Sequence, residues 1–291
     1  MQIDNFCLII GTQKGGTSSL FSYLSQHPQI AVSNIKETNF FSEAPQWEKG
    51  LDYYEGLWDW DEKRHAIALE ASPNYTNSLE EAMTVAERTH ALNTEQQTAF
   101  KFIYVLRNPL QKIESMRKQG VYQGWYEKYL EKETPESVPM EVIETVRYAD
   151  VVDVFVEKFS AEKMLLLRTE EISPKGEPAV AMRKICNFLE VDPAFEFALE
   201  KIHNARNSYR EDTLWHYLRS QQYFDPLKRL VPDTLKNKAR SALSKPLKPN
   251  EKVVSSLLPA QKEFIVNALK EERNRLSGTY GLDVSAWSRA T

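Results

Sequence analysis

A glycine-rich segment near the amino terminus constrains the fold of this chain more than any other feature. Residues 11–18 read GTQKGGTS and stand between an apolar run, Phe6–Ile10, and an amphipathic stretch that begins at Thr17. Glycines let successive backbone N–H groups curl around an anion, and the start of a helix adds further unpaired N–H donors. The order of strand, glycine loop and helix therefore predicts an anion-binding loop at the end of a first β-strand.

The polar residues of this loop narrow the class of ligand. Lys14 supplies a positive charge, and Thr17 and Ser18 supply hydroxyl donors, which an ordinary strand-to-helix turn does not need. In the nucleoside triphosphatase loop, G-x-x-x-x-G-K-[ST], the lysine follows the second glycine, but here Thr17 stands in that place. A magnesium–ATP site also uses an acidic residue near the end of a neighbouring strand, whereas the strongest later strand ends in Arg107 and Asn108. The pattern favours a nucleotide bound without metal.

Short apolar runs alternate with helical patterns along the chain, which predicts βαβ units and a parallel sheet. The expected strands are Phe6–Ile10, Ile30–Ser33, Ala66–Glu70, Phe102–Leu106 and Met164–Leu167. The expected helices include Thr17–His27, a helix capped by Asn108 that ends at Gly120, and an amphipathic helix over Pro259–Leu276. The predicted fold class is α/β, with about five parallel strands flanked by helices in the manner of P-loop kinases.

The length of 291 residues fits one domain over residues 1–291, with a core at about 6–190 and a helical part at 191–291. Within that part, residues 236–250 are basic and are expected to form a flexible surface loop; a contact with a membrane or a polyanion is the alternative. The net charge of −4 disfavours a nucleic-acid partner. Cys7 and Cys186 are too few for a disulfide framework and are expected in the core as thiols.

The amino terminus, MQIDNFCLII, has no basic region and no apolar run that could span a bilayer. We therefore expect a cytoplasmic chain without a transmembrane segment. No group of residues has the spacing of metal ligands, so no metal is expected. The oligomeric state is left open.

Arg107 and Ser115 predict a second anion site. Arg107 ends a buried apolar strand, where a charge without a partner is costly. Asn108 and Ser115 are seven residues apart, about two helical turns, and so share one face of the helix. Together Arg107 and Ser115 could hold one phosphate. The alternative is a structural ion pair for Arg107 and a solvent-facing Ser115. Beside the glycine loop, two anion sites at strand ends fit a nucleotide with phosphate groups at both ends of its ribose.

With these motifs in order, the chain resembles the sulfotransferase superfamily that uses 3'-phosphoadenosine 5'-phosphosulfate as donor. The resemblance covers about residues 6–190. It is carried by QKGGTS at 13–18, IKETNFF at 35–41, EASPNY at 70–75, RNPLQKIES at 107–115, and MLLLRTEEI at 164–172 followed by CNFL at 186–189. The lysine–glutamate segment at 36–37 is similar to that of the heparan-sulfate-type branch.

The resemblance implies roles for particular residues. The donor's 5'-phosphosulfate would lie on Gln13, Lys14, Gly15, Gly16, Thr17 and Ser18, and its 3'-phosphate on Arg107 and Ser115. A late basic loop at 203–210 would add Arg206, unless it is a plain polar turn. Glu37 would be the general base and Lys14 would neutralise the leaving group, although by pattern alone Glu37 is a surface carboxylate before the apolar pair Phe40–Phe41. The acceptor side would use Lys36, Glu70, Ser72 and Tyr75.

The acceptor is not identified by the sequence. Many heparan-sulfate-type members carry a lysine after the glutamate of the E-x-S-P-x-Y segment, whereas this chain has Ala71, which weakens the case for a highly sulfated glycan. The predicted acceptor is the hydroxyl, or the amine, of a carbohydrate or small metabolite. Two other functions stay open: a nucleotide-dependent phosphotransferase on the same fold, and a non-catalytic relative that binds nucleotide or a protein partner.

Overall fold

The structure is a computed structural model that describes residues 3–122, 125–199 and 256–289. These residues belong to one compact unit, which comprises Met1–Ile202 and Ser255–Thr291. A second unit, His203–Val254, lies outside the described residues. The expectations for Arg206, for the loop at 203–210 and for the basic segment at 236–250 therefore also lie outside them, and the prediction of one domain over the whole chain stays a prediction.

A five-stranded parallel sheet forms the centre of the unit, as predicted. The strands are β1 (Asn5–Gly11), β2 (Ile30–Val32), β3 (Ile67–Ala71), β4 (Ala99–Leu106) and β5 (Met164–Arg168). Their order across the sheet is β2-β3-β1-β4-β5, and all neighbouring pairs are parallel. Because every strand runs the same way, all five carboxyl ends meet at one edge of the sheet, where ligands of open α/β sheets bind.

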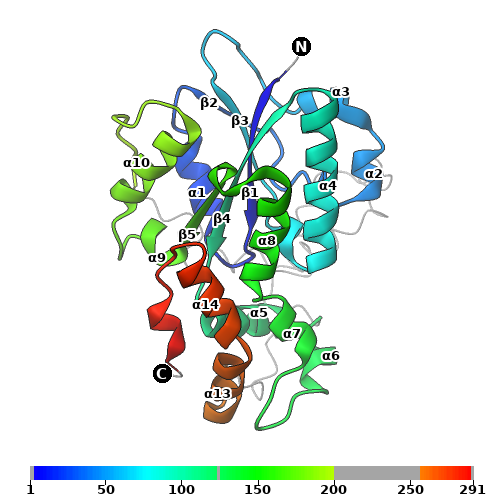
Figure 1. Ribbon diagram of the computed structural model, residues 1–291, viewed down its shortest axis with the longest axis vertical. Coiled ribbons are helices and arrows are strands. Elements are labelled where there is room, and N and C mark those ends of the chain that lie inside the picture. Colours follow the sequence, from blue (N-terminus) through cyan, green and yellow to red (C-terminus); the bar gives the residue numbers. More distant parts are fainter. Residues whose placement is uncertain (1–2, 123–124, 200–255, 290–291) are drawn as a thin grey trace, which may run out of the picture. The chain divides into compact units, whose positions relative to one another are not determined.

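Helices cover both faces of this sheet (Figure 1). On one face lie α1 (Thr17–Leu24) and α10 (Pro178–Leu189), and on the other lie α3 (Gly50–Glu55), α4 (Leu79–Glu95) and α8 (Tyr148–Phe159). Alternate residues of β1 serve the two faces: Phe6 and Leu8 join one core cluster, while Cys7 and Ile9 join the other. Burial on both faces explains why the strands read as continuous apolar runs in the sequence.

Further helices lie around the carboxyl edge of the sheet or connect the main elements (Figure 1). They are α2 (Ala44–Trp47), η1 (Pro73–Thr76), α5 (Pro109–Tyr122), α6 (Glu127–Leu130), α7 (Met140–Glu144), η2 (Ala161–Lys163), α9 (Thr169–Ile172), α13 (Pro259–Ala268), α14 (Lys270–Gly278) and η6 (Ser285–Ser288). Local chemistry sets several of these starts. At α4, the Ser78 hydroxyl accepts from the backbone N–H of Glu81 and the Glu81 carboxylate accepts from that of Ser78, a reciprocal cap.

Three predicted helix bounds differ from the structure. The first helix ends at Leu24 rather than His27. The amphipathic helix predicted at the carboxyl end is divided into α13 and α14. Helix α5 continues through Gly120 to Tyr122, because this glycine serves packing rather than termination. A Cβ there would stand 2.6 Å from that of Tyr126 and 2.9 Å from the Trp125 ring.

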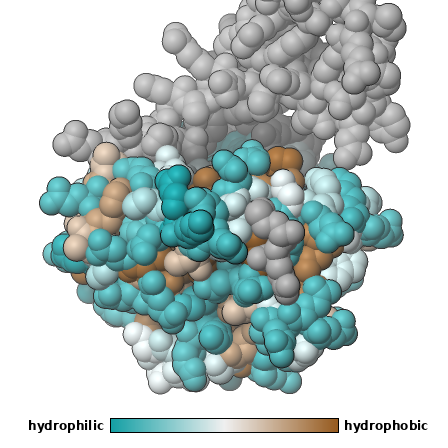
Figure 2. Space-filling view, turned by 90° about the horizontal axis from the view of Figure 1, so that it is seen from above, coloured by the Kyte–Doolittle hydropathy of each residue, from teal (hydrophilic) through white to brown (hydrophobic). Residues whose placement is uncertain are grey.

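Cys7 and Cys186 are buried free thiols, which confirms the prediction that both are core residues. No helix in the described part of the chain is long and apolar enough to cross a membrane. Figure 2 views the end of the sheet where β1 begins, opposite the carboxyl edge. The described residues there form a largely hydrophilic surface in which apolar side chains make small, separate patches.

Candidate functional site

The predicted motifs come together at the carboxyl edge of the sheet. The glycine loop follows β1, Arg107 follows β4, and the segment that holds Lys36 and Glu37 follows β2. The EASPNY segment begins in β3 and continues into η1. Segments that are up to a hundred residues apart in the sequence therefore lie at the ends of neighbouring strands.

The glycine loop has the backbone conformation of an anion-binding turn. Gly16, directly before α1, adopts φ 95°, and Lys14 adopts φ 66°, so the chain alternates into the left-handed region before the helix starts. Gly15 leaves no room for a side chain, since a Cβ would stand 2.8 Å from the Val105 carbonyl oxygen. Thr17 is buried at the first turn of α1 and Ser18 is half-buried beside it.

Hydrogen bonds from the neighbouring strands fix the backbone of this loop. The guanidinium of Arg107 donates from Nη1 to the Lys14 carbonyl oxygen at 2.9 Å. The hydroxyl of Thr169 lies 2.9 Å from the carbonyl oxygen of Gly15 and 3.1 Å from that of Leu106. The three strand ends β1, β4 and β5 are thus joined at the loop, and the two predicted anion-binding motifs are in direct contact.

Two hydrogen bonds hold the turn that carries Arg107. The hydroxyl of Tyr148 donates to the Arg107 carbonyl oxygen at 2.9 Å, and the Asn108 side chain accepts from the backbone N–H of Leu110, which caps α5. Ser115 is half-buried on the second turn of α5. Lys112, on the first turn of α5, is almost wholly buried. Its amine donates to the Thr145 carbonyl oxygen and lies 5.3 Å from the Tyr148 ring centre. Burial lowers the pKa of Lys112 to about 7.

Glu37 is exposed at the rim of this edge, with 42% of its side chain accessible. Its Oε1 lies 2.5 Å from Nζ of Lys36, and its backbone N–H donates to the Ala71 carbonyl at 3.1 Å. Glu37 and Asn39 both adopt left-handed backbone conformations, with φ 62° and 49°. Such conformations are uncommon for residues other than glycine, so the surrounding contacts must hold them.

Glu70 is a second carboxylate in the same region, and it is fully buried. Four hydroxyl groups donate to it: Tyr75 at 2.7 Å and Tyr54 at 2.8 Å to Oε1, Thr38 at 2.5 Å and Ser72 at 2.8 Å to Oε2. Burial raises the pKa of Glu70, and these hydrogen bonds oppose the rise. We call Glu70 and these four residues the Glu70 cluster. Its members are all at most 8% exposed, so they lie beneath the surface of the site.

A chain of carboxamides joins the glycine loop to the Glu37 segment. Gln13 donates from Nε2 to Oδ1 of Asn74 at 2.6 Å, and Asn74 donates from Nδ2 to Oδ1 of Asn39 at 3.3 Å. Each of the three motifs contributes one member of this chain. Gln13, which is predicted to bind the donor, thus also connects the glycine loop with the Glu37 segment.

Sequence reasoning missed several residues that shape the site. Thr169 directly follows β5, so the rule that functional groups follow strand ends could have identified it. Thr38 lies inside a quoted motif but has no separate signal. Tyr54 and Tyr148 stand in helices whose aromatic residues are typical of core packing, and no local pattern distinguishes their hydroxyl groups.

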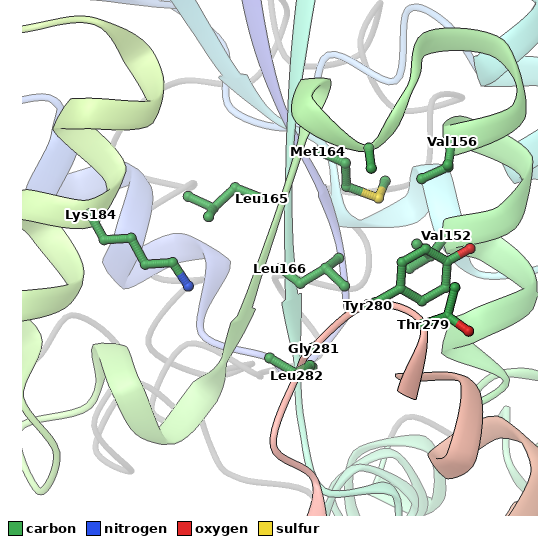
Figure 3. A pocket seen from close by; sticks show the side chains of 11 residues that line it. Val152, Val156, Met164, Leu165, Leu166, Lys184, Thr279, Tyr280, Gly281 and Leu282 are labelled. Atoms are coloured by element: carbon green, nitrogen blue, oxygen red, sulfur yellow. The ribbon is translucent and has the colours of Figure 1, made fainter. Parts of the chain in front are cut away.

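A pocket of about 260 Å³ lies elsewhere, along the outer edge of β5 (Figure 3). Apolar side chains of α8 and β5 line it, and Lys184 points toward it from α10. None of the predicted site residues is among those that line it. This pocket is therefore separate from the carboxyl-edge site.

Comparisons with known proteins point to one family. A family model for the sulfotransferase domain matches residues 4–222. A bifunctional heparan sulfate N-deacetylase/N-sulfotransferase 1 from Caenorhabditis briggsae is 23% identical over 217 residues, which is 65% of this chain and 23% of that protein. A heparan sulfate glucosamine 3-O-sulfotransferase 5 from Mus musculus is 30% identical over 102 residues, 35% of this chain and 27% of that protein.

The fold also matches a solved structure. The crystal structure of a sulfotransferase from Alicyclobacillus acidocaldarius aligns over 99% of this chain and 100% of its own, with a TM-score of 0.62 and 21% identity. The chain spans about a quarter of the length of the two curated relatives above.

Proposed function

The chain belongs to the sulfotransferase domain family, and we propose that it transfers a sulfuryl group from 3'-phosphoadenosine 5'-phosphosulfate to an acceptor hydroxyl or amine. Glu37 is the general base in this proposal, and Lys14 stabilises the leaving group. The donor's phosphosulfate end lies on residues 13–18 and its 3'-phosphate on Arg107 and Ser115. Arg206, which lies outside the described residues, is proposed to add a further contact with the donor.

The observation that carries the proposal is the contact between the two anion-binding motifs. With Nη1 of Arg107 2.9 Å from the Lys14 carbonyl oxygen, the guanidinium stands directly beside the loop. A ligand with phosphate groups on both sides of one ribose needs this kind of adjacency. The close approach at Gly15 and the left-handed turns at Lys14 and Gly16 fit an oxyanion held by backbone N–H groups.

The proposed chemistry needs one proton acceptor and one cation. As the acceptor oxygen forms its bond to sulfur, the Glu37 carboxylate takes the proton from that oxygen. The bond between sulfur and the bridging phosphate oxygen breaks at the same time, and the Lys14 ammonium stabilises the negative charge left on that oxygen. Nζ of Lys36, 2.5 Å from Oε1 of Glu37, holds the carboxylate in place until the acceptor arrives.

For the acceptor, we propose the hydroxyl of a carbohydrate or a small metabolite. The two curated relatives are named for heparan sulfate, which supports a glycan. Ala71, which stands beside Glu70 and is fully buried, brings no cation to this side of the site. That absence of charge at position 71 favours an acceptor less anionic than a heavily sulfated glycan.

The test is transfer of labelled sulfate from the donor to a panel of sugars, glycans and small hydroxyl compounds. We expect transfer without added metal, and Glu37→Gln should lower kcat roughly 10²-fold while donor binding is kept. Glu43→Gln, a carboxylate six residues along the same segment, is the matched control and should retain activity.

Three results would contradict the proposal. Glu37→Gln with an unchanged rate would remove Glu37 as the base. Stabilisation by magnesium–ATP but not by adenosine 3',5'-bisphosphate would favour a phosphotransferase. Tight bisphosphate binding without transfer to any member of the panel would favour a non-catalytic relative.

A further inference from the structure

The Glu70 cluster makes a second set of contacts that concerns the proposed base. Three of its four hydroxyl oxygens each accept a backbone N–H from the segment after Glu37. Asn39 donates to Ser72 at 3.2 Å, Phe40 to Thr38 at 3.3 Å, and Phe41 to Tyr75 at 3.3 Å. Three consecutive backbone N–H groups of the Glu37 segment thus donate to hydroxyl oxygens, and these hydroxyls themselves donate to Glu70.

The direction of these hydrogen bonds is set by the carboxylate. An ionised carboxylate is an acceptor only, with about four lone-pair sites on its two oxygens. Here two hydroxyls reach each oxygen, so all these sites are filled. Each hydroxyl has one hydrogen. The Thr38 and Tyr75 oxygens lie 3.2 Å apart, but their contacts with Glu70 are shorter, at 2.5 and 2.7 Å, so each hydrogen points to Glu70 and each oxygen is left to accept. Glu70 therefore turns three hydroxyl oxygens toward the backbone N–H groups of residues 39–41.

This segment needs such support. Glu37 and Asn39 hold left-handed backbone conformations that cost free energy in residues other than glycine. The turn is also tied to β3 by the backbone bond from Glu37 to Ala71, and the Phe40 ring stacks on Tyr54 with ring centres 4.3 Å apart. Without the hydroxyl acceptors, three buried or half-buried N–H groups would lose their partners, and the turn could relax toward commoner backbone angles.

We propose that Glu70 is a positioning residue for Glu37, and that it acts through the hydroxyls of Thr38, Ser72 and Tyr75 on the backbone at 39–41. This inference rests on the proposed function for its effect on rate, because Glu37 is the base there. Its structural part does not: the ordering of the 39–41 backbone by the hydroxyls can be measured in the protein without turnover.

The cluster supplies its own matched control. Tyr54 and Tyr75 are both fully buried, and both donate to the same oxygen of Glu70, at 2.8 and 2.7 Å. The Tyr75 oxygen also accepts the N–H of Phe41, whereas the Tyr54 oxygen accepts no hydrogen bond from the backbone at 39–41. Tyr75→Phe and Tyr54→Phe therefore remove equal numbers of donors from Glu70, but only the first removes an acceptor from the Glu37 segment.

The experiment compares these two variants by amide hydrogen exchange and by kinetics. Tyr75→Phe should speed exchange at Phe41 roughly 10-fold, while Tyr54→Phe leaves it near the wild-type rate. In the transfer assay, Tyr75→Phe should lower kcat roughly 10-fold with the KM for donor nearly unchanged, because a misplaced base affects the chemical step. Tyr54→Phe should keep kcat within about twofold.

Thr38 gives a second comparison should either tyrosine variant fold poorly. Thr38→Val keeps the side-chain shape but removes the hydroxyl, and should loosen the Phe40 amide and lower kcat. Thr38→Ser restores the hydroxyl and should restore both. Equal exchange and equal kcat in the two tyrosine variants, or full activity in Thr38→Val, would overturn the inference. If the wild type transfers no sulfate, the proposed function fails, and exchange at 39–41 still decides whether the hydroxyls order this segment.

Discussion

The proposed site has two halves, a donor half made by the glycine loop with Arg107 and an acceptor half made by the segment around Glu37, and they are held in different ways. On the donor half, the glycine loop is fixed through main-chain carbonyl groups: those of Lys14 and Gly15 receive donors from Arg107 and Thr169. On the acceptor half, the segment around Glu37 is fixed through one buried carboxylate, Glu70, and its hydroxyl partners. The donor half is thus held at main-chain carbonyl groups, whereas the acceptor half is held by side-chain hydroxyls around one buried carboxylate.

This difference separates what substitutions should do. A change in the donor half alters groups that we propose to bind the donor's phosphates, so it should appear in the affinity for the donor as well as in the rate. A change in the acceptor half alters the placement of a base, so it should appear in kcat with donor affinity kept. The carboxamide chain through Gln13, Asn74 and Asn39 joins the halves. Through this chain, a substitution in one half could alter both donor affinity and the placement of the base.

The largest expected effect belongs to Lys14. If its substitution lowered kcat but left donor affinity unchanged, the contrast between the two halves would fail. Lys14→Ala removes the charge that stabilises the leaving group, and kcat should fall roughly 10³-fold. Binding of adenosine 3',5'-bisphosphate, measured by calorimetry, should weaken as well. Lys36→Ala is the control, since this lysine pairs with Glu37 and should leave bisphosphate binding unchanged. Equal bisphosphate affinity in Lys14→Ala and the wild type would remove Lys14 from the donor half.

Arg107 should give the next largest effect and would show which end of the donor it holds. Arg107→Ala should weaken adenosine 3',5'-bisphosphate roughly 10²-fold and adenosine 5'-monophosphate much less, because only the first carries a 3'-phosphate. Loss of its bond to the Lys14 carbonyl affects both ligands alike. Arg168→Ala, at the end of the adjacent strand and paired with Glu171 and Asp283, should leave the preference for the bisphosphate intact. An equal loss for both ligands would contradict the assignment.

The placement of the glycine loop and Arg107 at neighbouring strand ends was largely predictable from the sequence. Its signals are local: a run of glycines, a lysine and hydroxyls between an apolar strand and a helix, and an arginine at the end of another strand. The same local rules predicted five strands with bounds close to those observed, because strands buried on both faces must be apolar throughout. Errors arose where packing decides instead, as at Gly120, which looks like a helix end but makes room for Trp125 and Tyr126.

The acceptor half was not predictable to the same depth. Glu37 was chosen by resemblance, because an exposed carboxylate has no pattern that separates a base from a surface residue. The Glu70 cluster brings together side chains 16 and 32 residues away from Glu70, which no local periodicity specifies. Moreover, the hydroxyls of Tyr54 and Tyr75 look alike in the sequence, and only their contacts in the fold distinguish them.

The smallest expected effect concerns two buried ionisable groups, Glu70 in the acceptor half and Lys112 near Arg107 on α5. Burial raises the pKa of Glu70 in the folded chain. As pH rises above the ordinary pKa of a glutamate, the unfolded chain therefore releases this proton before the folded chain does. The contribution of Glu70 to the free energy of unfolding thus falls as pH rises. For Lys112 the sign is opposite. The pKa of Lys112 is lowered from 10.5 to about 7, so between these values the unfolded chain binds the proton that the folded chain lacks, and stability rises with pH.

Lys112→Met tests this sign. From pH 7 to pH 9 the wild type should gain about 2 kcal/mol in its free energy of unfolding from this group, measured with urea, and the variant should lose that gain. Lys101→Met is the control, since Lys101 is also buried but pairs with Glu190. This variant should keep the rise in the free energy of unfolding between pH 7 and pH 9. The same slope in Lys112→Met and the wild type would show that Lys112 keeps its proton in the folded protein. The opposite pH dependence expected of Glu70 and Lys112 would then not hold.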